Sequence, residues 1–319
     1  MVTKKACIPA MLLTGFLLIC VIGTLGAGGI AEKKFVPDGT VEIVVPADSG
    51  GASDLLAHII ASLLGQSLHP VEFKVVFKPG GSGTAALAYV NGRKDADQTL
   101  LVANTSQILA ILEERKNLPL TPIARLATDP ILLVVPADSG YSDLAMFVNS
   151  ARAEELLVGT ADAFDRYCVA RMNSEIGLTL RTIYFNSALP VINGMLEGSL
   201  DAGILNPSEA MEGVAAGKLR ILAAFSETDL PVLSFAGLGY GELAFQLSRY
   251  LFGPQGMHDE ARLFWSEALS IMTQRREWES GYLEQNHLHG EYLDSTMARS
   301  YLETEELPRL HSILDMDAP

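Results

Sequence analysis

Apolar residues recur along the chain in two alternating patterns. Short β-rich runs such as residues 41–45 end at a turn, and stretches such as residues 54–64 then carry apolar residues at helical spacing. Strands that alternate with helices in this way are typical of an α/β protein with a mainly parallel sheet. The same patterns predict further strands at 73–77, 98–103, 131–135, 155–158, 180–185, 202–205 and 219–224, and further helices at 84–91, 142–153, 160–176, 189–198 and 208–216.

The first 31 residues differ from the rest of the chain. A positive start at residues 4–5 precedes an apolar run and then small residues, and no acidic residue occurs before Glu32. This order is typical of a secretory signal peptide, here cleaved after Ala31, so we expect an exported, periplasmic protein. A retained membrane anchor is the alternative, because the run is near the minimum spanning length. A lipoprotein signal at Cys20 is weaker, because the bulky Ile19 precedes it.

The mature chain contains a second cycle of strands and helices. The pentapeptide Pro-Ala-Asp-Ser-Gly occurs at residues 46–50 and again at 136–140, each time after an apolar strand. This repeat favours two similar α/β lobes that use the same strand exit, although chance repetition of a turn sequence is the alternative. The order of the elements predicts that both ends of the chain form lobe 1, with residues 32–130 and 229–319, and that residues 131–228 form lobe 2.

The composition and charge of the chain exclude several classes of protein. The chain has 319 residues, 49% of them hydrophobic, which excludes disorder. A net charge of -15 excludes nucleic-acid binding through a basic face. Only Cys168 would remain after cleavage, so we expect no disulfide and a buried cysteine that behaves as a small hydrophobe. We also expect no cofactor, because ATP and nicotinamides are cytosolic.

Motifs for catalysis and metal binding are missing from the sequence. No Gly-x-Ser-x-Gly elbow occurs, and residues 213–218 fall one residue short of a phosphate loop and lack its Ser or Thr. His287 and His289 lie close together, without the Cys or carboxylate cluster of a zinc site. We therefore expect neither a catalytic nor a metal site.

A glycine-rich loop follows the first strand and precedes the first helix. Helix N-termini offer free N–H groups and a positive dipole end, and glycines let a ligand approach the backbone. Such a loop predicts a site for a carboxylate or phosphate that needs no Lys or Arg. The alternative is that the glycines serve the turn alone, with Ser53 and Asp54 capping the helix. The loop consists of Ser49, Gly50, Gly51, Ala52 and Ser53.

Residues 44–54 resemble the strand-loop-helix signature of the solute-binding receptors of tripartite tricarboxylate transporters, the Bug or TctC family. That signature is an apolar strand, Pro, three variable residues, Gly-Gly, two residues and Asp. The resemblance covers about residues 41 to 290, and the order and spacing of the motifs carry it. Further similar segments are residues 78–83, 99–101, 104–106, 121–126, 134–139 and 216–223.

The resemblance implies a type II periplasmic binding protein fold, or Venus flytrap. In it, two α/β lobes are joined by a two-strand hinge and hold the ligand in the cleft between them. It also implies periplasmic capture of a small carboxylate, an organic acid or acidic amino acid, and delivery to membrane permease subunits. We expect a monomer that is not an enzyme.

The resemblance also carries over the binding residues. Ser49 to Ser53 would hold a ligand carboxylate through backbone N–H groups, and Asp54 would cap the helix or meet an amino or hydroxyl group. The remaining positions would line the two lobes. They are Asn104, Thr105 and Ser106 in the first lobe, and Thr160, Ala161, Asp162, Ala163 and Asn206 in the second.

The second-lobe loop departs from the family pattern, which is rich in Gly and Ser with a His a few residues on. Here Asp162 and Asp165 add negative charge, and Arg166 takes the approximate position of the His. Tyr184-Phe185 replaces the usual Pro-Tyr. These changes put a standard dicarboxylate ligand in doubt. Arg166 either pairs with a ligand carboxylate, neutralises Asp162, or forms a surface ion pair.

Two further functions stay open from the sequence. The first is a ligand sensor that signals to a membrane kinase, and the second is an exported hydrolase on a similar α/β frame. Cleavage would make the mature chain more acidic than -15. Long-range electrostatics would then oppose an anionic ligand, so its attraction must be short-range.

Overall fold

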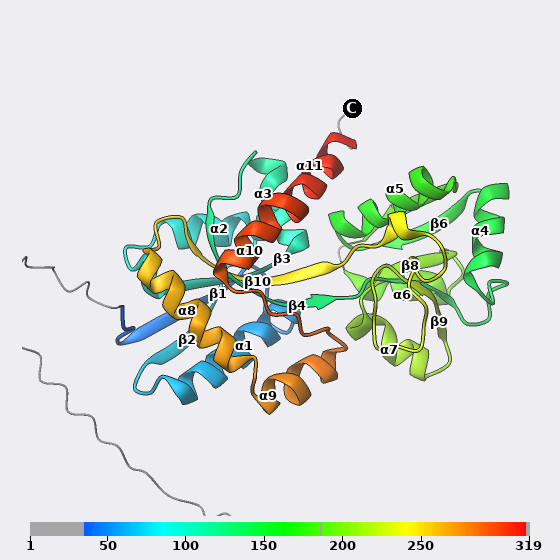
Figure 1. Cartoon of the computed structure of the whole chain (residues 1–319). Coiled ribbons are helices and arrows are strands. Elements are labelled where there is room, and N and C mark those ends of the chain that lie inside the picture. Colours follow the sequence, from blue (N-terminus) through cyan, green and yellow to red (C-terminus); the bar gives the residue numbers. More distant parts are fainter. Residues whose placement is uncertain (1–34, 186, 317–319) are drawn as a thin grey trace, which may run out of the picture. The chain divides into compact units, whose positions relative to one another are not determined.

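The computed structural model describes residues 35–185 and 187–316. The expected signal peptide, residues 1–31, lies outside these ranges. The described chain alternates strands and helices and forms two five-stranded sheets (Figure 1). We call each sheet with its helices a lobe.

The first lobe contains the sheet β2-β1-β3-β10-β4. Strands β1, β2 and β3 pair in parallel, and β10 joins antiparallel between β3 and β4. The strands are β1 (Thr40–Val45), β2 (Glu72–Phe77), β3 (Thr99–Asn104), β4 (Leu120–Asp129) and β10 (Leu247–Pro254). The helices are α1 (Ala52–Ser67), α2 (Thr84–Asn91), α3 (Thr105–Glu114) and α8 (Asp259–Met272), followed in the tail by α9 (Arg276–Trp278), α10 (Ser295–Tyr301) and α11 (Leu307–Met316).

The second lobe repeats this plan with the sheet β7-β6-β8-β5-β9. Strands β6, β7 and β8 are parallel, and β5 lies antiparallel between β8 and β9. The strands are β5 (Leu132–Pro136), β6 (Leu156–Thr160), β7 (Leu180–Tyr184), β8 (Ala202–Leu205) and β9 (Leu219–Ala224). The helices are α4 (Leu144–Ala153), α5 (Ala163–Ile176), α6 (Ala188–Leu196) and α7 (Pro207–Ala215).

The chain crosses between the two sheets twice. It passes from β4 directly to β5, and it returns from β9 to β10 through a longer segment. The first sheet is thus built from both ends of the chain. The exact lobe boundaries, at residues 130 and 229, stay a prediction.

The α/β class is confirmed, and four of the five strands in each sheet run in one direction, as expected for mainly parallel sheets, whereas β10 in the first sheet and β5 in the second run in the opposite direction. Each sheet has two parallel and two antiparallel pairings. The antiparallel strands β10 and β5 each begin after a crossing from the other sheet, and local periodicity does not show the direction in which such a strand joins. The sequence patterns also missed α3, β4 and β10.

The repeated pentapeptide does not mark equivalent places in the two lobes. Its first copy follows β1, which is second in its sheet, whereas its second copy follows β5, which is fourth. The lobes are similar in topology, but the counterpart of β1 is β6. The prediction of a shared strand exit was therefore wrong.

Apolar residues on both faces of each sheet explain the continuous hydrophobic runs. In β1, Val41, Ile43 and Val45 face one cluster and Val44 the other, as the alternation of side chains along a strand requires. The first cluster includes Trp265 of α8, which is fully buried. Its indole N–H donates to the carbonyl of Asp97 at 2.7 Å, so the buried polar atom is satisfied.

Replacing Gly159 with alanine is expected to destabilise the protein by about 1–3 kcal/mol, because of overpacking. A Cβ at this position of β6 would lie 2.6 Å from Val191 Cγ1 and 2.7 Å from Leu200 Cδ1. Urea unfolding measures the change. Gly140→Ala in the same lobe is the control, since its Cβ would meet nothing within 4 Å. Equal stability of the two variants would contradict close packing of Val191 and Leu200 against Gly159.

Candidate functional site

Corresponding strand ends of the two lobes define the place to look for a site. Strands β1 and β3 of the first lobe, and β6 and β8 of the second, each lead into a helix: α1, α3, α5 and α7. In open α/β sheets, ligands bind outside the carboxyl ends of the strands. The loops before these four helices are therefore the candidates.

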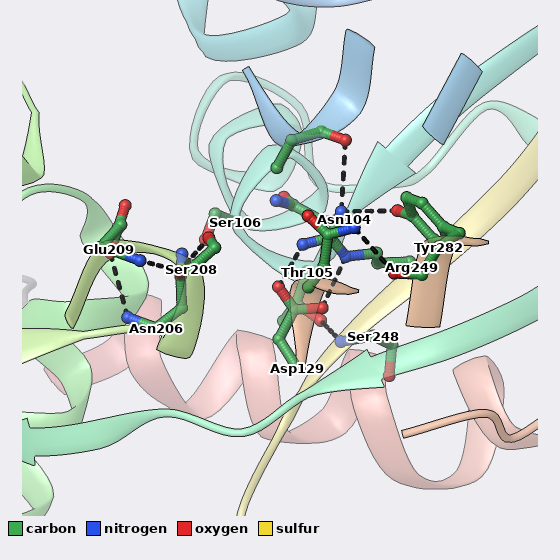
Figure 2. Close-up of polar contacts among 12 residues, drawn as sticks. Asn104, Thr105, Ser106, Asp129, Asn206, Ser208, Glu209, Ser248, Arg249 and Tyr282 are labelled. Carbon is green, nitrogen blue, oxygen red and sulfur yellow. Dashed lines mark hydrogen bonds and ion pairs between the residues drawn. The ribbon is translucent and has the colours of Figure 1, made fainter. Parts of the chain in front are cut away.

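Three of these helices begin with a reciprocal capping box. Asn104 accepts the N–H of Gln107 at 3.0 Å, and Gln107 accepts the N–H of Asn104 at 2.7 Å. Asp162 with Asp165 at α5, and Asn206 with Glu209 at α7, repeat the arrangement; Figure 2 shows the latter pair. Each box satisfies two backbone donors at the helix start. Helix α1 begins at Gly51 with no side-chain cap.

A cleft of about 410 Å³ lies between the ends of β1 and α3 in the first lobe and β7 and α5 in the second. Six of the residues expected to bind ligand line it: Asn104, Ser106, Ala161, Asp162, Ala163 and Arg166. The sequence reasoning missed Ala47, Gln107, Glu113 and Tyr184, which also line it. The Asn104–Gln107 spacing of a capping box was the available signal for Gln107.

A hydrogen bond crosses this cleft. The Ser106 hydroxyl at the start of α3 donates to Asp162 Oδ2 at the start of α5, at 2.8 Å. Asp162 Oδ1 accepts the N–H of Asp165 at 2.9 Å. One carboxylate thus caps a helix of the second lobe and contacts the first.

Arg166 is the cation of the cleft. Its guanidinium carbon lies 5.3 Å from the centroid of the Tyr184 ring. None of the ion pairs within residues 35–185 and 187–316 includes Arg166. Neutralisation of Asp162 and a surface ion pair, the two alternatives to ligand binding, therefore find no support, and the charge faces the cleft without a carboxylate partner in the described part of the chain.

Two further carboxyl groups sit beside Asp162. Burial, followed by the charge of Asp162, raises the pKa of Asp165 well above its ordinary value. Burial raises the pKa of Glu209 to about 7, and the charges of Asp162 and Asp129 act in the same direction. Both buried groups therefore favour their neutral, protonated forms beside the charge of Asp162.

The profile of the tripartite tricarboxylate transporter family receptors, TctC, matches residues 78–261, which is more than half of the chain. The chain belongs to the TctC receptor family. The chain is also similar to BugT of Bordetella pertussis, with 26% identity over 262 residues, 75% of this chain and 79% of that protein. A UPF0065 protein of Bordetella bronchiseptica is 25% identical, and the match spans 65% of each chain.

Solved structures share the fold of this TctC receptor. MatC of Rhodopseudomonas palustris, with bound malate, has a TM-score of 0.71 at 20% identity and covers 87% of this chain and 99% of its own. An R. palustris protein with adipate has a TM-score of 0.73 at 19% identity and covers 88% and 97%. The two-lobe α/β fold implied by the sequence is confirmed.

Not every expected binding residue of this TctC receptor lines the cleft. Thr105 and Thr160 are fully buried, so neither side chain meets solvent. The Thr105 hydroxyl donates to Glu306 Oε1 at 2.5 Å. It also accepts the N–H of Ser248 at 2.8 Å, and Figure 2 shows these two residues. It therefore joins α3 to β10 and the tail. Asn206 caps α7, outside the cleft lining.

The glycine loop of this receptor adjoins the cleft without lining it. The lining reaches Pro46 and Ala47 and does not include Ser49, Gly50, Gly51, Ala52, Ser53 or Asp54. Asp54 Oδ2 accepts the N–H of Gly50 at 2.7 Å, and Asp54 Oδ1 lies 3.1 Å from His58. The N-cap is Gly51, so the expectation that Ser53 or Asp54 caps α1 was wrong. Asp54 folds back onto the loop instead.

A buried ion pair of the first lobe contacts the glycine loop at the carbonyl of Ala52. Arg249 of β10 makes two hydrogen bonds to Asp129 of β4, both at 2.5 Å (Figure 2). Its remaining amine donates to the Ala52 carbonyl at 3.2 Å and to the Tyr282 hydroxyl at 2.9 Å. Sequence reasoning missed this group. Single charges inside the apolar runs around residues 126–129 and 247–252 were the signal, because such charges are buried only when paired.

Proposed function

We propose that this receptor captures a small carboxylate, an organic acid or acidic amino acid, in the cleft between its lobes. It then delivers the ligand to the permease subunits of a tripartite tricarboxylate transporter, and it works as a monomer. The observation that carries the proposal is Arg166, a cation that faces the cleft without an acidic partner in the described residues. MatC with malate and the R. palustris protein with adipate support a carboxylate ligand.

The cleft supplies short-range donors for an anion. An Arg guanidinium binds a carboxylate through two parallel hydrogen bonds. The first N–H groups of an α-helix have no partner within the helix. In α3, the Asn104 side chain accepts one of them, the N–H of Gln107. The uncapped start of α1 adds further donors beside the cleft. These groups supply the local attraction that an acidic chain needs.

We propose a periplasmic location, with the N-terminal segment as a cleaved signal peptide. Among residues 35–185 and 187–316, no helix is both long and apolar enough to cross a membrane. BugD, to which the chain is similar in fold, is a periplasmic binding protein. Genes for two membrane permease subunits beside this one would favour transport over signalling to a sensor kinase.

We infer that binding proceeds without catalysis. The family is one of receptors, and the hydroxyl of Ser106 in the cleft donates to a carboxylate that also caps α5, with no histidine among the described residues that line this cleft. Ligand contacts to the first N–H groups of α3 in the first lobe and to Arg166 in the second would favour the closed arrangement by a population shift. Activity on a panel of esters or phosphates would revive the hydrolase alternative.

A thermal-shift screen tests the proposed function. The panel contains mono-, di- and tricarboxylates and acidic amino acids. A ligand of the native state raises the melting temperature as its concentration increases. No response across the panel would contradict the proposal.

Replacing Arg166 with alanine is expected to weaken binding of the best carboxylate by about 10- to 100-fold, the range for a hydrogen bond to a charged group. Calorimetric titration measures the change, and Arg166→Lys should recover part of the affinity because it keeps the charge. Arg181→Ala is the control. Arg181 is also in the second lobe, but it is 57% exposed and pairs with Glu155. Full affinity in Arg166→Ala would remove Arg166 from the site.

A further inference from the structure

The cleft holds its positive and negative groups apart. Asp162 and Arg166 are four residues apart at the start of α5, a spacing at which opposite charges are neighbours on a helix. They form no ion pair within 4.0 Å. Instead, Asp162 bonds Ser106 and the N–H of Asp165, and Arg166 lies over Tyr184. A ligand in the cleft therefore meets a positive pole at one side chain and a negative pole at the other.

Further acidic residues lie near Asp162, in both lobes. Glu113 of α3 lines the cleft from the first lobe. Asp165 and Glu209 lie close enough to Asp162 for its charge to raise the pKa of both. A ligand carboxylate at this pole would place a second negative charge beside that of Asp162 in a partly desolvated site, which is unfavourable.

Asp162 also occupies the donors that an anion would use there. A carboxylate between the N-termini of two helices is normally held by their N–H groups and by a Ser or Thr hydroxyl. At this place the Ser106 hydroxyl and the Asp165 N–H both donate to Asp162. The chain thus carries its own carboxylate at the position where the second carboxylate of a dianion would dock.

We propose that Asp162 restricts this receptor to carboxylates whose other end is uncharged or carries a protonated amine. The inference rests on the proposed function. The ligand carboxylate pairs with Arg166, and a hydroxyl or ammonium group at the far end donates to Asp162. Malate and adipate, found in MatC and in the R. palustris relative, each carry two carboxylates. We expect this chain, with the charge of Asp162 in its cleft, to bind such dicarboxylates poorly.

Calorimetric titration of matched ligands tests this inference. Each dicarboxylate is paired with the ω-amino acid of similar length: succinate with β-alanine, glutarate with γ-aminobutyrate, and adipate with δ-aminovalerate. In the wild-type protein, the best amino acid should bind at least about tenfold more tightly than its dicarboxylate partner. In Asp162→Asn, that ratio should fall by about tenfold or reverse. Asparagine is itself a good N-cap, so α5 stays capped, and Asp162→Ser provides a second neutral cap.

Asp138→Asn is the matched control. It removes the same charge from an exposed turn after β5, so it should leave the ratio unchanged. A wild-type protein that prefers the dicarboxylate, or a ratio that Asp162→Asn does not move, would overturn the inference. The proposed function would then still stand, because a carboxylate binds. Failure of every carboxylate to bind would overturn the proposed function and this inference together.

Discussion

Replacing Asp129 with alanine is expected to lower the free energy of unfolding by about 3–5 kcal/mol, the usual result of breaking a buried ion pair on one side. The Asp129 side chain is 4% exposed and that of Arg249 is 7% exposed. Without Asp129, the guanidinium stays buried with no carboxylate partner between the end of β4 and the start of β10. Denaturant unfolding followed by circular dichroism measures the loss.

The control for this prediction is an ion pair at the surface. Glu155 and Arg181 are 52% and 57% exposed, and exposed pairs contribute about 0–1 kcal/mol. Glu155→Ala should therefore change stability little. If Asp129→Ala were no less stable than Glu155→Ala, the account of the pair would fail. Because Arg249 also holds the Ala52 carbonyl, we expect loss of the pair to displace the start of α1 beside the cleft.

Stability is expected to fall as the pH rises from 5 to 8, and Glu209 carries a large share of this change. Its pKa is raised from 4.5 to about 7 in the folded protein, chiefly by burial. Between these values the folded protein keeps a proton that the unfolded chain has lost. The stabilising contribution of protonated Glu209 is complete below the pKa of this group in the unfolded chain. It is lost as the pH rises through the pKa of the group in the folded protein. At pH 8 the loss is at most about 3 kcal/mol.

Glu209→Gln isolates this contribution. Glutamine keeps an oxygen that accepts the N–H of Asn206, but it does not titrate. The variant should gain up to about 3 kcal/mol relative to wild type between pH 5 and pH 8, measured by urea unfolding at each pH. Part of the decline should remain, because the pKa of Asp165 is raised in the same direction, and Asp165→Asn should remove that part. Parallel pH profiles for wild type and Glu209→Gln would contradict the prediction.

Local patterns were enough to predict most of the strands and helices. Segments such as β1 and α1 carry their periodicity within a few residues, so neighbouring positions alone identify them. Helix α3 was missed because Asn104, Thr105 and Ser106 resemble a closing loop. In the structure, the first of these residues is the N-cap and the other two begin the helix.

Burial of the site residues depends on partners far along the chain. Buried Thr105 bonds Glu306, 201 residues away, and Asp129 pairs with Arg249 across 120 residues. No local pattern records such pairs. Arg166, in contrast, was predictable from its position in the second-lobe loop. The sequence did not predict that Arg166 forms no ion pair with Asp162, because Asp162 bonds Ser106 in the other lobe instead.

A crystal structure of the protein with the best carboxylate from the screen tests the central claim most directly. We expect the ligand in the cleft between α3 and α5, with one carboxylate bonded to the Arg166 guanidinium. A ligand outside this cleft would contradict it, for example in the cavity lined by Phe225, Phe245 and Arg309. A ligand in the cleft with its carboxylate away from Arg166 would contradict the assigned role of that residue.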